Sequence, residues 1–229
     1  MIAPHPDDEV IGCGGLISRV KREGGQVHVL YVAVDDLAEY SPAGRSTIEQ
    51  RMDEIEQVAK FLSLDSWDVP WVGEGATLGL DTVARAKIVR LLEGPGHRLA
   101  LSTLRPTVVV APEITSFNQD HQAIGQAVLT ALRPGSDQWR HQPSLVLAYE
   151  QVGDFWSGAA VAPQSRNFFV ALDDADVDRK IAALGLHVSQ WREHPHTRSE
   201  QALRGLAAMR GAHSGVPCAE AFHCLRWRG

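Results

Sequence analysis

Apolar runs typical of buried strands alternate along the chain with apolar positions at helical spacing. The strand-like runs are rich in β-branched residues and lie at residues 26–34, 66–72, 107–112, 145–150 and 167–170. The helical patterns cover residues 44–64, 81–93, 120–132, 173–190 and 198–209. Because strands and helices alternate, the sequence predicts an α/β fold with a mainly parallel sheet and right-handed crossovers.

Residues that favour helix ends and loops refine the boundaries of these elements. Asp81 is a candidate cap for the second helix and Gly94 its stop. Residues 133–142 and 153–166 are expected to be long surface loops. No repeat or low-complexity linker divides the chain, so we expect one domain over residues 1–229.

The amino terminus departs from the usual pattern of such folds. Only three residues, Met1 to Ala3, precede a Pro-His-Pro turn, whereas strands commonly have about five or six residues. We therefore expect a first strand that is clipped here or longer in the natural protein. The following helix is expected to be entered near residues 12–15.

Composition narrows the function classes. The 229 residues are 44% hydrophobic and 22% charged, as in ordinary globular proteins. A formal charge of −6 without any basic run argues against nucleic acid as the partner, and no apolar run is long enough to span a bilayer. The three cysteines form no CxxC pair, and no basic leader precedes Asp7, so we expect a reducing, cytoplasmic setting. Homo-oligomer formation is left open.

The opening stretch MIAPHPDDEVIGCGG places a histidine and several acidic residues directly after the first strand. In open α/β sheets, reactive groups gather where strands end at their carboxyl edge. His5 and Asp8 are spaced to converge on one ion from a turn stiffened by Pro4 and Pro6, while Asp7 stays free to act as a base. The competing interpretation is that the acids simply cap the amino terminus of a helix.

A second cluster follows the strand at residues 107–112. His121 lies at a strand-to-helix junction like that of His5, and it is the best candidate for a third metal ligand. Taken alone, His121 fits an ordinary surface or cap residue. Two such clusters in one α/β chain favour a zinc site, although iron(II) or another divalent ion suits two imidazoles and a carboxylate equally well.

The glycines around Cys13 do not indicate a nucleotide site. GCGG matches neither GxGxxG nor GxxxxGK[ST], so dinucleotide binding is excluded. Cys13 itself is expected to be a small packing residue rather than a nucleophile.

Several motifs together resemble one known family. APHPDDEVIGCGG resembles the amino-terminal signature of the LmbE/PIG-L family of zinc-dependent N-acetyl-sugar deacetylases, and NQDHQAIGQAV resembles its HxDH motif. QRMDEIEQVAKFLSL is similar to its R-x-x-E-x-x-x-A-x-x-x-L helix, and SQW and GVPCAEAF are similar to its later segments. The resemblance implies a Rossmann-like, three-layer α/β/α fold.

The resemblance also implies roles for individual residues. His5, Asp8 and His121 would hold zinc, Asp7 would be the general base, and Arg51 would be a basic group near the pocket. A zinc-bound water would attack the acetyl carbonyl, and Asp7 would move the proton to the departing amine. Arg51 also fits a simple ion pair on a solvated helix face.

Asn118 departs from the family pattern, which commonly has a second histidine there. Asparagine donates a hydrogen bond to an oxyanion but cannot deliver a proton, so the substitution is expected to matter for catalysis. Asp120 is expected either to orient a ligand imidazole or to cap a helix. Asp35 and Asp36, after the second strand, are candidates to bind sugar hydroxyls.

These observations lead to three hypotheses. The first is a zinc-dependent deacetylase acting on N-acetylglucosamine or its small conjugates. The second is an amidase or deacylase of a thiol-sugar conjugate or another acyl amide on the same metal site. The third is a catalytically decayed domain that binds sugar or metal. The candidates for a wall that stacks against the sugar are Trp67, Trp71, Trp139, Trp156 and Trp191, and the alternative is that most of them anchor the core or a loop.

Overall fold

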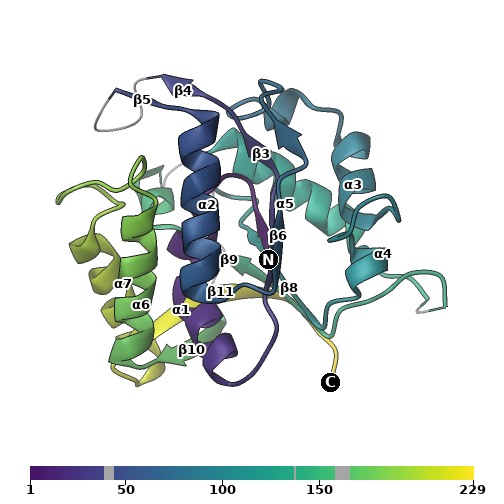
Figure 1. The fold of residues 1–229 in the computed structure, drawn as a ribbon. Helices are drawn as coiled ribbons and strands as arrows, with labels where there is room; N and C mark the ends of the chain where they lie inside the picture. The colour runs from purple at the N-terminus through teal and green to yellow at the C-terminus, as the bar shows by residue number, and fades with distance from the viewer. Residues whose placement is uncertain (39–43, 137, 158–165) are drawn as a thin grey trace.

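The computed structural model describes residues 1–38, 44–136, 138–157 and 166–229. Within them, a central sheet is covered by helices on both faces, as Figure 1 shows with the sheet seen nearly edge-on. The predicted three-layer α/β/α fold is confirmed.

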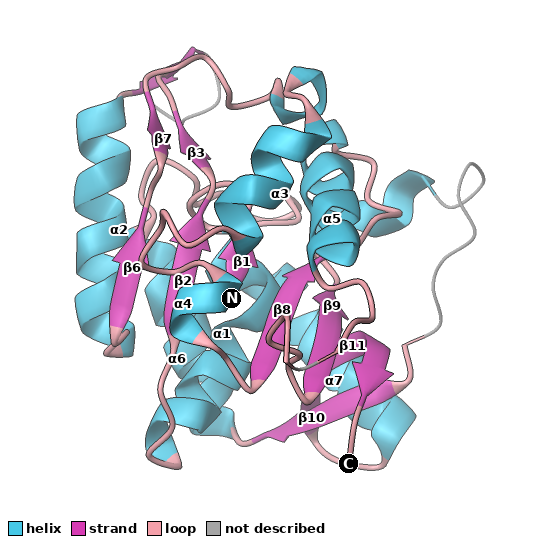
Figure 2. Cartoon of the chain, turned by 90° about the vertical axis from the view of Figure 1, so that its right-hand side faces the viewer, coloured by secondary structure: helices cyan, strands magenta, loops and turns pink. Residues whose placement is uncertain are grey.

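The strands form two groups that lie side by side. In the first, β1 (Ile2–Ala3) pairs with β2 (His28–Tyr31) and β2 with β6 (Ser66–Asp68), all parallel. In the second, β8 (Val108–Pro112) and β9 (Leu145–Tyr149) are parallel, and β11 (Cys218–Trp227) runs antiparallel to β9 and to β10 (Phe168–Leu172). Because β1 lies next to β8 (Figure 2), the carboxyl ends of β1 and β8 reach the same edge.

Two short pairs extend the sheet at that edge. β3 (Ala33–Val34) and β7 (Trp71–Val72) are parallel and continue the lines of β2 and β6. Beyond them, β4 (Leu37–Ala38) pairs antiparallel with β5 (Arg45–Ser46).

The helices divide between the two faces of the sheet (Figure 1). One face carries α1 (Asp8–Arg22), α2 (Ile48–Leu62), α6 (Asp174–Leu186) and α7 (Glu200–Ser214). The other carries α3 (Arg85–Glu93), α4 (Leu101–Leu104) and α5 (Gln119–Ala131). Two 3₁₀ turns, η1 (Leu80–Thr82) and η2 (Val152–Ser157), complete the described elements. None of these helices combines the length and apolar character needed to cross a lipid bilayer.

Side-chain alternation along the strands builds two cores. On β2, Val29 and Tyr31 belong to the core under α1 and α2, whereas Leu30 belongs to the core under α3 and α5. On β8, Val110 and Val109 divide in the same way. Strands with both faces covered read as continuous apolar runs, which is why the sequence pattern located them.

Several predicted boundaries were wrong. The strand expected at 26–34 is broken into β2 and β3, and the helix expected at 44–64 starts only at Ile48, where the Thr47 side chain accepts a hydrogen bond from the Gln50 amide. Asp81 does not cap the second helix, because it lies in η1 and the cap position of α3 is Ala84. Gly94 does end α3, as expected.

Two further features differ from expectation. α1 begins at Asp8, so the GCGG segment lies inside the helix rather than at its entry. β11, the longest strand described, was not predicted. Residues 133–136 and 138–142 form no helix or strand, as expected, whereas the loop expected at 153–166 begins with η2 and its residues 158–165 lie outside the described part of the chain.

The first strand is as short as the sequence suggested. Beyond its amino end lies an apolar cavity of about 710 Å³, whose lining includes Met1, Leu16, Val109 and Leu145. The cavity sits at the amino ends of the parallel strands, so it is separate from the edge that carries the acid and histidine side chains.

Candidate metal centre

The turn between β1 and α1 holds its side chains rigidly. Asp7 adopts a left-handed backbone conformation, with φ 105°, and its amide donates a hydrogen bond of 2.9 Å to Glu9 Oε2. The His5 amide similarly donates to Asp8 Oδ2 at 2.9 Å. A left-handed non-glycine residue costs about 1–3 kcal/mol and is typical of functional sites, where the surrounding structure enforces it.

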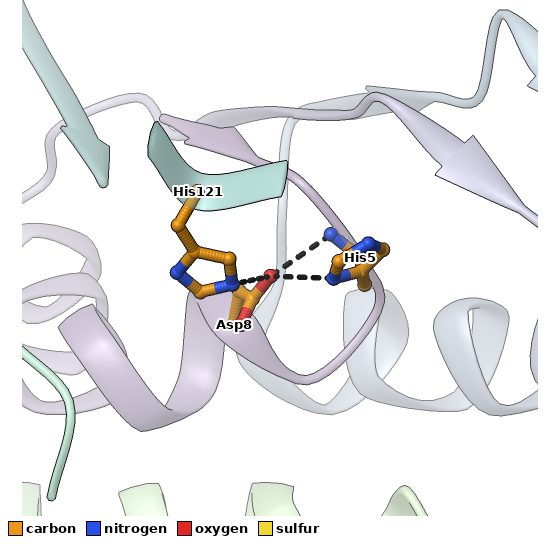
Figure 3. Close-up of side chains that lie close together, drawn as sticks. All are labelled: His5, Asp8 and His121. Carbon is orange, nitrogen blue, oxygen red and sulfur yellow. Dashed lines mark hydrogen bonds and ion pairs between the residues drawn. The ribbon is translucent and has the colours of Figure 1, made fainter. Parts of the chain in front are cut away.

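Three side chains from two strand ends converge on one point (Figure 3). His5 comes from the turn after β1, Asp8 is the first residue of α1, and His121 comes from the first turn of α5, which follows β8. One potential ligand atom from each lies within 4.8 Å of the others. Asp8 Oδ2 is 3.5 Å from His5 Nδ1 and 3.3 Å from His121 Nε2. Two imidazole nitrogens and a carboxylate oxygen match the protein ligands of catalytic zinc and suit other divalent ions.

Asp120 fixes the orientation of His5. Its Oδ2 lies 2.7 Å from His5 Nε2, and the two carboxylate oxygens also accept hydrogen bonds from the amides of Leu78 and Leu80. Since Asp120 is fully buried and receives these donors, it is an acceptor for the Nε2–H of the imidazole, which places Nδ1 of His5 on the side of Asp8. The cap of α5 is Asn118 instead.

The buried groups of the cluster shift one another's pKa values. Burial alone lowers the pKa of His5, but the carboxylates of Asp120 and Asp8 outweigh it and raise that pKa to about 9. Burial opposes the charge of Asp8, yet the imidazoles of His121 and His5 hold its pKa well below the usual range. The cluster is therefore built around a negative carboxylate that attracts a cation.

Asp7 is buried beside this cluster without belonging to it. Burial raises the pKa of Asp7, against the opposing effect of the Arg198 guanidinium. Arg198 Nε lies 3.1 Å from Asp7 Oδ2, and this oxygen has no hydrogen-bond partner among the described residues. A carboxyl group with a raised pKa next to three potential metal ligands has the properties of a general base.

Arg51 lies beneath the turn rather than on a solvated helix face. It is 2% exposed, and its Nη2 donates a 2.8 Å hydrogen bond to the Pro6 carbonyl oxygen. Its Nη1 is buried and finds no acceptor within the described ranges. The surface ion pair considered as its alternative is wrong, because burial removes the residue from the solvent.

Three other candidate residues order the backbone around the site. The carboxylate of Asp35 accepts hydrogen bonds from the amides of Gly75 and Thr77, and exposed Asp36 pairs with Arg45. Asn118 Oδ1 accepts from the Asp120 amide at 2.9 Å. Sugar binding by Asp35 and Asp36, and a catalytic role for Asn118, stay predictions.

Sequence reasoning missed three residues that contact Asp8 or its neighbours Asp7 and Glu9. Gln151 follows β9, and its Nε2 donates to Asp8 Oδ1 at 2.5 Å. His187 Nε2 lies 2.7 Å from Glu9 Oε1 and thereby ties α6 to α1. Arg198 reaches Asp7 from the segment before α7. Only Gln151 had a detectable signal, namely its position directly after a predicted strand.

The tryptophans proposed as a stacking wall divide into two groups. Trp67, Trp71 and Trp191 pack against the apolar cores, whereas Trp139 and Trp156 are exposed. Trp156 contacts exposed Phe117 edge-on, with 5.9 Å between ring centroids. Phe117 immediately precedes Asn118, the cap residue of α5, so the contact brings Trp156 close to the start of this helix.

Comparison with known proteins agrees with this fold. A family model described as PIG-L, GlcNAc-PI de-N-acetylase, matches residues 1–132. No curated protein gives a significant match. The conserved protein TT1542 from Thermus thermophilus has a similar structure, with 24% identity, a TM-score of 0.71 and coverage of 96% of this chain and 91% of that chain.

Two further structures have the same fold and different activities. N,N'-diacetylchitobiose deacetylase from Pyrococcus horikoshii is 20% identical, with a TM-score of 0.69 and coverage of 98% of this chain and 82% of that chain. GalB, the 4-carboxy-2-hydroxymuconate hydratase from Pseudomonas putida KT2440, is 17% identical, with a TM-score of 0.69 and coverage of 100% and 95%.

The chain is a three-layer α/β/α domain with a His/Asp/His cluster at the carboxyl edge of its sheet, and its fold is the one of LmbE-like structures. The family match covers residues 1–132 of the 229, which is more than half of the chain. The chain belongs to the PIG-L (LmbE-like) family.

Proposed function

We propose that this protein is a metal-dependent hydrolase that removes the N-acetyl group from an N-acetylglucosamine-type sugar or sugar conjugate. The observation that carries the proposal is the donor set of His5, Asp8 and His121 with the buried carboxyl group of Asp7 beside it. The family match and the deacetylases among the structural neighbours support the same reaction class. A fold shared with a hydratase does not select the reaction by itself.

His5, Asp8 and His121 would hold the ion, with zinc the expected one and another divalent metal an alternative. When bound, zinc would supply a Lewis acid that polarises the acetyl carbonyl and acidifies a water molecule. Asp120 would keep the His5 ring oriented for the ion, and Gln151 would hold the second oxygen of Asp8.

Asp7 would take the proton from the attacking water and return it to the sugar amine as the amide bond breaks. Its raised pKa suits both steps, because a stronger base accepts the first proton more readily. Asn118 would contribute at most a neutral hydrogen bond to the oxyanion, so proton delivery would depend on Asp7 alone. Asp35 and Asp36 would contact the sugar, and Arg51 would supply positive charge near the pocket from beneath the turn.

A second candidate function is removal of a longer acyl group or cleavage of another amide, such as that of a thiol-sugar conjugate, on the same site. The exposed pair Phe117 and Trp156 favours it, because such a pair offers apolar surface to an acyl chain near the start of α5. The depth of the pocket under residues 153–166 would distinguish the two candidates, and residues 158–165 of that segment lie outside the described part of the chain.

The test combines metal content with amine release from matched N-acyl substrates. We expect the protein purified with zinc to contain about one ion per chain and to release free amine from N-acetylglucosamine conjugates. His121→Ala should remove both properties, whereas His28→Ala, on β2, should keep both. Faster release from longer acyl groups would favour the second candidate.

Two results would overturn the proposal. A folded, metal-supplemented protein without a bound divalent ion contradicts the hydrolase outright. A loaded protein that binds N-acetylglucosamine without ever releasing amine would instead support the decayed, sugar- or metal-binding domain.

A cytoplasmic setting and a homo-oligomeric state stay predictions of the sequence.

A further inference from the structure

The two oxygens of the Asp8 carboxylate have different partners. Oδ2 lies 3.5 Å from His5 Nδ1 and 3.3 Å from His121 Nε2 (Figure 3), and it also accepts the hydrogen bond from the His5 amide. Oδ1 accepts a 2.5 Å hydrogen bond from Gln151 Nε2. Because both imidazoles lie close to Oδ2, this oxygen is the one that would bind a metal ion, whereas the protein itself takes up Oδ1.

Gln151 comes from a different strand end than the three candidate ligands. It follows β9, whereas the candidate ligands follow β1 and β8. β9 pairs in parallel with β8, so the carboxyl ends of the two strands reach the same edge of the sheet. A third strand end therefore contacts the cluster, and it does so through the second oxygen of Asp8.

A chain of hydrogen bonds fixes the backbone at Gln151. The carboxylate of Asp154 accepts from the Gln151 amide at 3.2 Å and from the Ser116 hydroxyl at 2.6 Å. Ser116 is buried in the turn between β8 and α5, where its Oγ also accepts from the Asn118 amide. Asp154 thus joins the end of β9 to the turn that precedes His121, and Gln151 is presented to Asp8 in a defined position.

A carboxylate with one oxygen already hydrogen-bonded offers a metal ion a single oxygen. Zinc in proteins is usually four-coordinate, so one oxygen from a carboxylate is enough for it. Larger oxygen-preferring ions such as Ca²⁺ take about six to eight oxygen ligands and often use both oxygens of a carboxylate. Mn²⁺ likewise favours octahedral, oxygen-rich sites. Restricting Asp8 to one oxygen therefore favours the ion that needs fewer ligands.

We propose that Gln151 is a positioning residue that makes the site selective for zinc over larger, oxygen-preferring divalent ions such as Mn²⁺. It holds Oδ1 of Asp8, so Asp8 would coordinate through Oδ2 alone. This inference rests on the proposed metal site. It concerns which ion the chain selects and not which bond is hydrolysed, so it goes beyond the proposed reaction.

The test measures metal binding in the absence of substrate. Dissociation constants for Zn²⁺ and Mn²⁺ are obtained by competition with chromophoric chelators, for the unchanged protein and for Gln151→Leu, which keeps a side chain of similar size and removes its donor. We expect the variant to bind Zn²⁺ about tenfold more weakly, because loss of such a partner of a metal ligand typically costs about 10–100-fold in affinity. Binding of Mn²⁺ should stay equal or become tighter, so the preference for zinc should fall about tenfold or more.

Cobalt(II) supplies a spectroscopic readout that a merely structural role would not move. Co²⁺ with four or five ligands absorbs visible light more strongly than six-coordinate Co²⁺, so the absorption reports the coordination number. We expect strong absorption from the Co²⁺-loaded unchanged protein. Gln151→Leu should lose about half of it or more, because both oxygens of Asp8 become available to the ion.

Two further variants accompany this comparison. Gln57→Leu is the matched control, since it makes the same chemical change at an exposed position of α2, and its metal preference should equal that of the unchanged protein. Ser116→Ala removes only the hydroxyl that donates to Asp154. Its preference for zinc should fall in the same direction as in Gln151→Leu, by about threefold, and it decides the question if Gln151→Leu does not fold.

Three results would overturn the inference. They are a preference in Gln151→Leu within about twofold of the unchanged one, an equal loss of affinity for both ions, and a preference of the unchanged protein for Mn²⁺. Failure of the proposed function is distinguishable from these. A protein that selects zinc through Gln151 and releases no amine supports the inference and refutes the deacetylase. A protein that releases amine while Gln151→Leu keeps the preference refutes the inference and leaves the deacetylase intact.

Discussion

His5 Nε2 and Asp120 Oδ2 are 2.7 Å apart, although the two residues are 115 positions apart in the sequence. This hydrogen bond joins the turn after β1 to the first turn of α5, the two segments that supply the candidate metal ligands. Since the imidazole donates through Nε2, its Nδ1 is available to a metal ion in a fixed direction. Asp120 thus couples the folding of the two strand ends to the geometry of the site.

Replacing Asp120 by asparagine should weaken metal binding without unfolding the protein. An amide oxygen is a weaker acceptor for the imidazole N–H, and loss of such an orienting carboxylate typically costs about 10–100-fold in metal affinity. Competition with a chromophoric zinc chelator measures the change. Asp81→Asn, at an exposed position in η1, is the control and should bind zinc like the unchanged protein. Equal affinity in both variants would contradict the orienting role.

Asp7→Asn should abolish turnover and keep the metal. Removal of a general acid–base group lowers rates about 10²–10⁴-fold, and Asp7 is not among the three converging ligands. Asparagine tolerates the left-handed backbone of this position, so the turn is expected to persist. Amine release and zinc content measure the two effects.

The control for Asp7 is Asp53→Asn, on the exposed side of α2. It carries the same chemical change close to Arg51 in the sequence and should alter neither zinc content nor turnover. Turnover in Asp7→Asn within about threefold of the unchanged protein would exclude Asp7 as the base.

The fold was predictable because most strands are covered on both faces. The runs at 107–112 and 145–150 are continuous and apolar, and they became β8 and β9 within a residue or two. β11 was not predicted because its sequence, CAEAFHCLRW, mixes charged and apolar residues. Its Glu220 accepts from buried Lys180, a partner on α6 that no local pattern reveals.

The site residues that follow strands were predictable, whereas those in the connection between two helices were not. His5, Asp8 and His121 follow strands, so sequence position alone indicated that they converge. Arg198 reaches Asp7 from a connection between two helices, and its position depends on the anchoring of Ser189 by Glu54. That anchor spans 135 residues and has no signature in the sequence.

We expect the protein to lose stability as the solution becomes alkaline, because the stabilisation that protonated His187 provides is lost. Burial alone lowers the pKa of His187, but Glu9 and Glu54 raise it to about 9 from 6.5. A folded-state pKa above the unfolded value means that the folded state binds the proton more tightly. The stabilisation is therefore complete below about pH 6.5 and is lost as the pH rises through 9, with a total on the order of 3 kcal/mol.

Urea unfolding of the zinc-loaded protein between pH 6 and 10 measures this dependence. His187→Asn should be less stable at pH 6 and show a flatter dependence between pH 6.5 and 9. His5 has a similarly raised pKa in the metal-free protein, so zinc must be present to remove its contribution. An equally steep fall of stability in His187→Asn would show that other groups cause it.

Gly12 is expected to be irreplaceable for a steric reason. A Cβ atom at this position of α1 would lie 2.3 Å from Cδ2 of Tyr149, which is 1% exposed and packed in the core below the site. Gly12→Ala should therefore destabilise the protein by about 1–3 kcal/mol, despite the better helix propensity of alanine. Gly205→Ala, in the middle of α7 where a Cβ meets no atom within 4 Å, should instead stabilise it by about 0.4–1 kcal/mol. Urea unfolding of both variants compares the two signs directly. If both substitutions stabilise the protein, Gly12 of α1 does not pack against Tyr149 of β9 as closely as described.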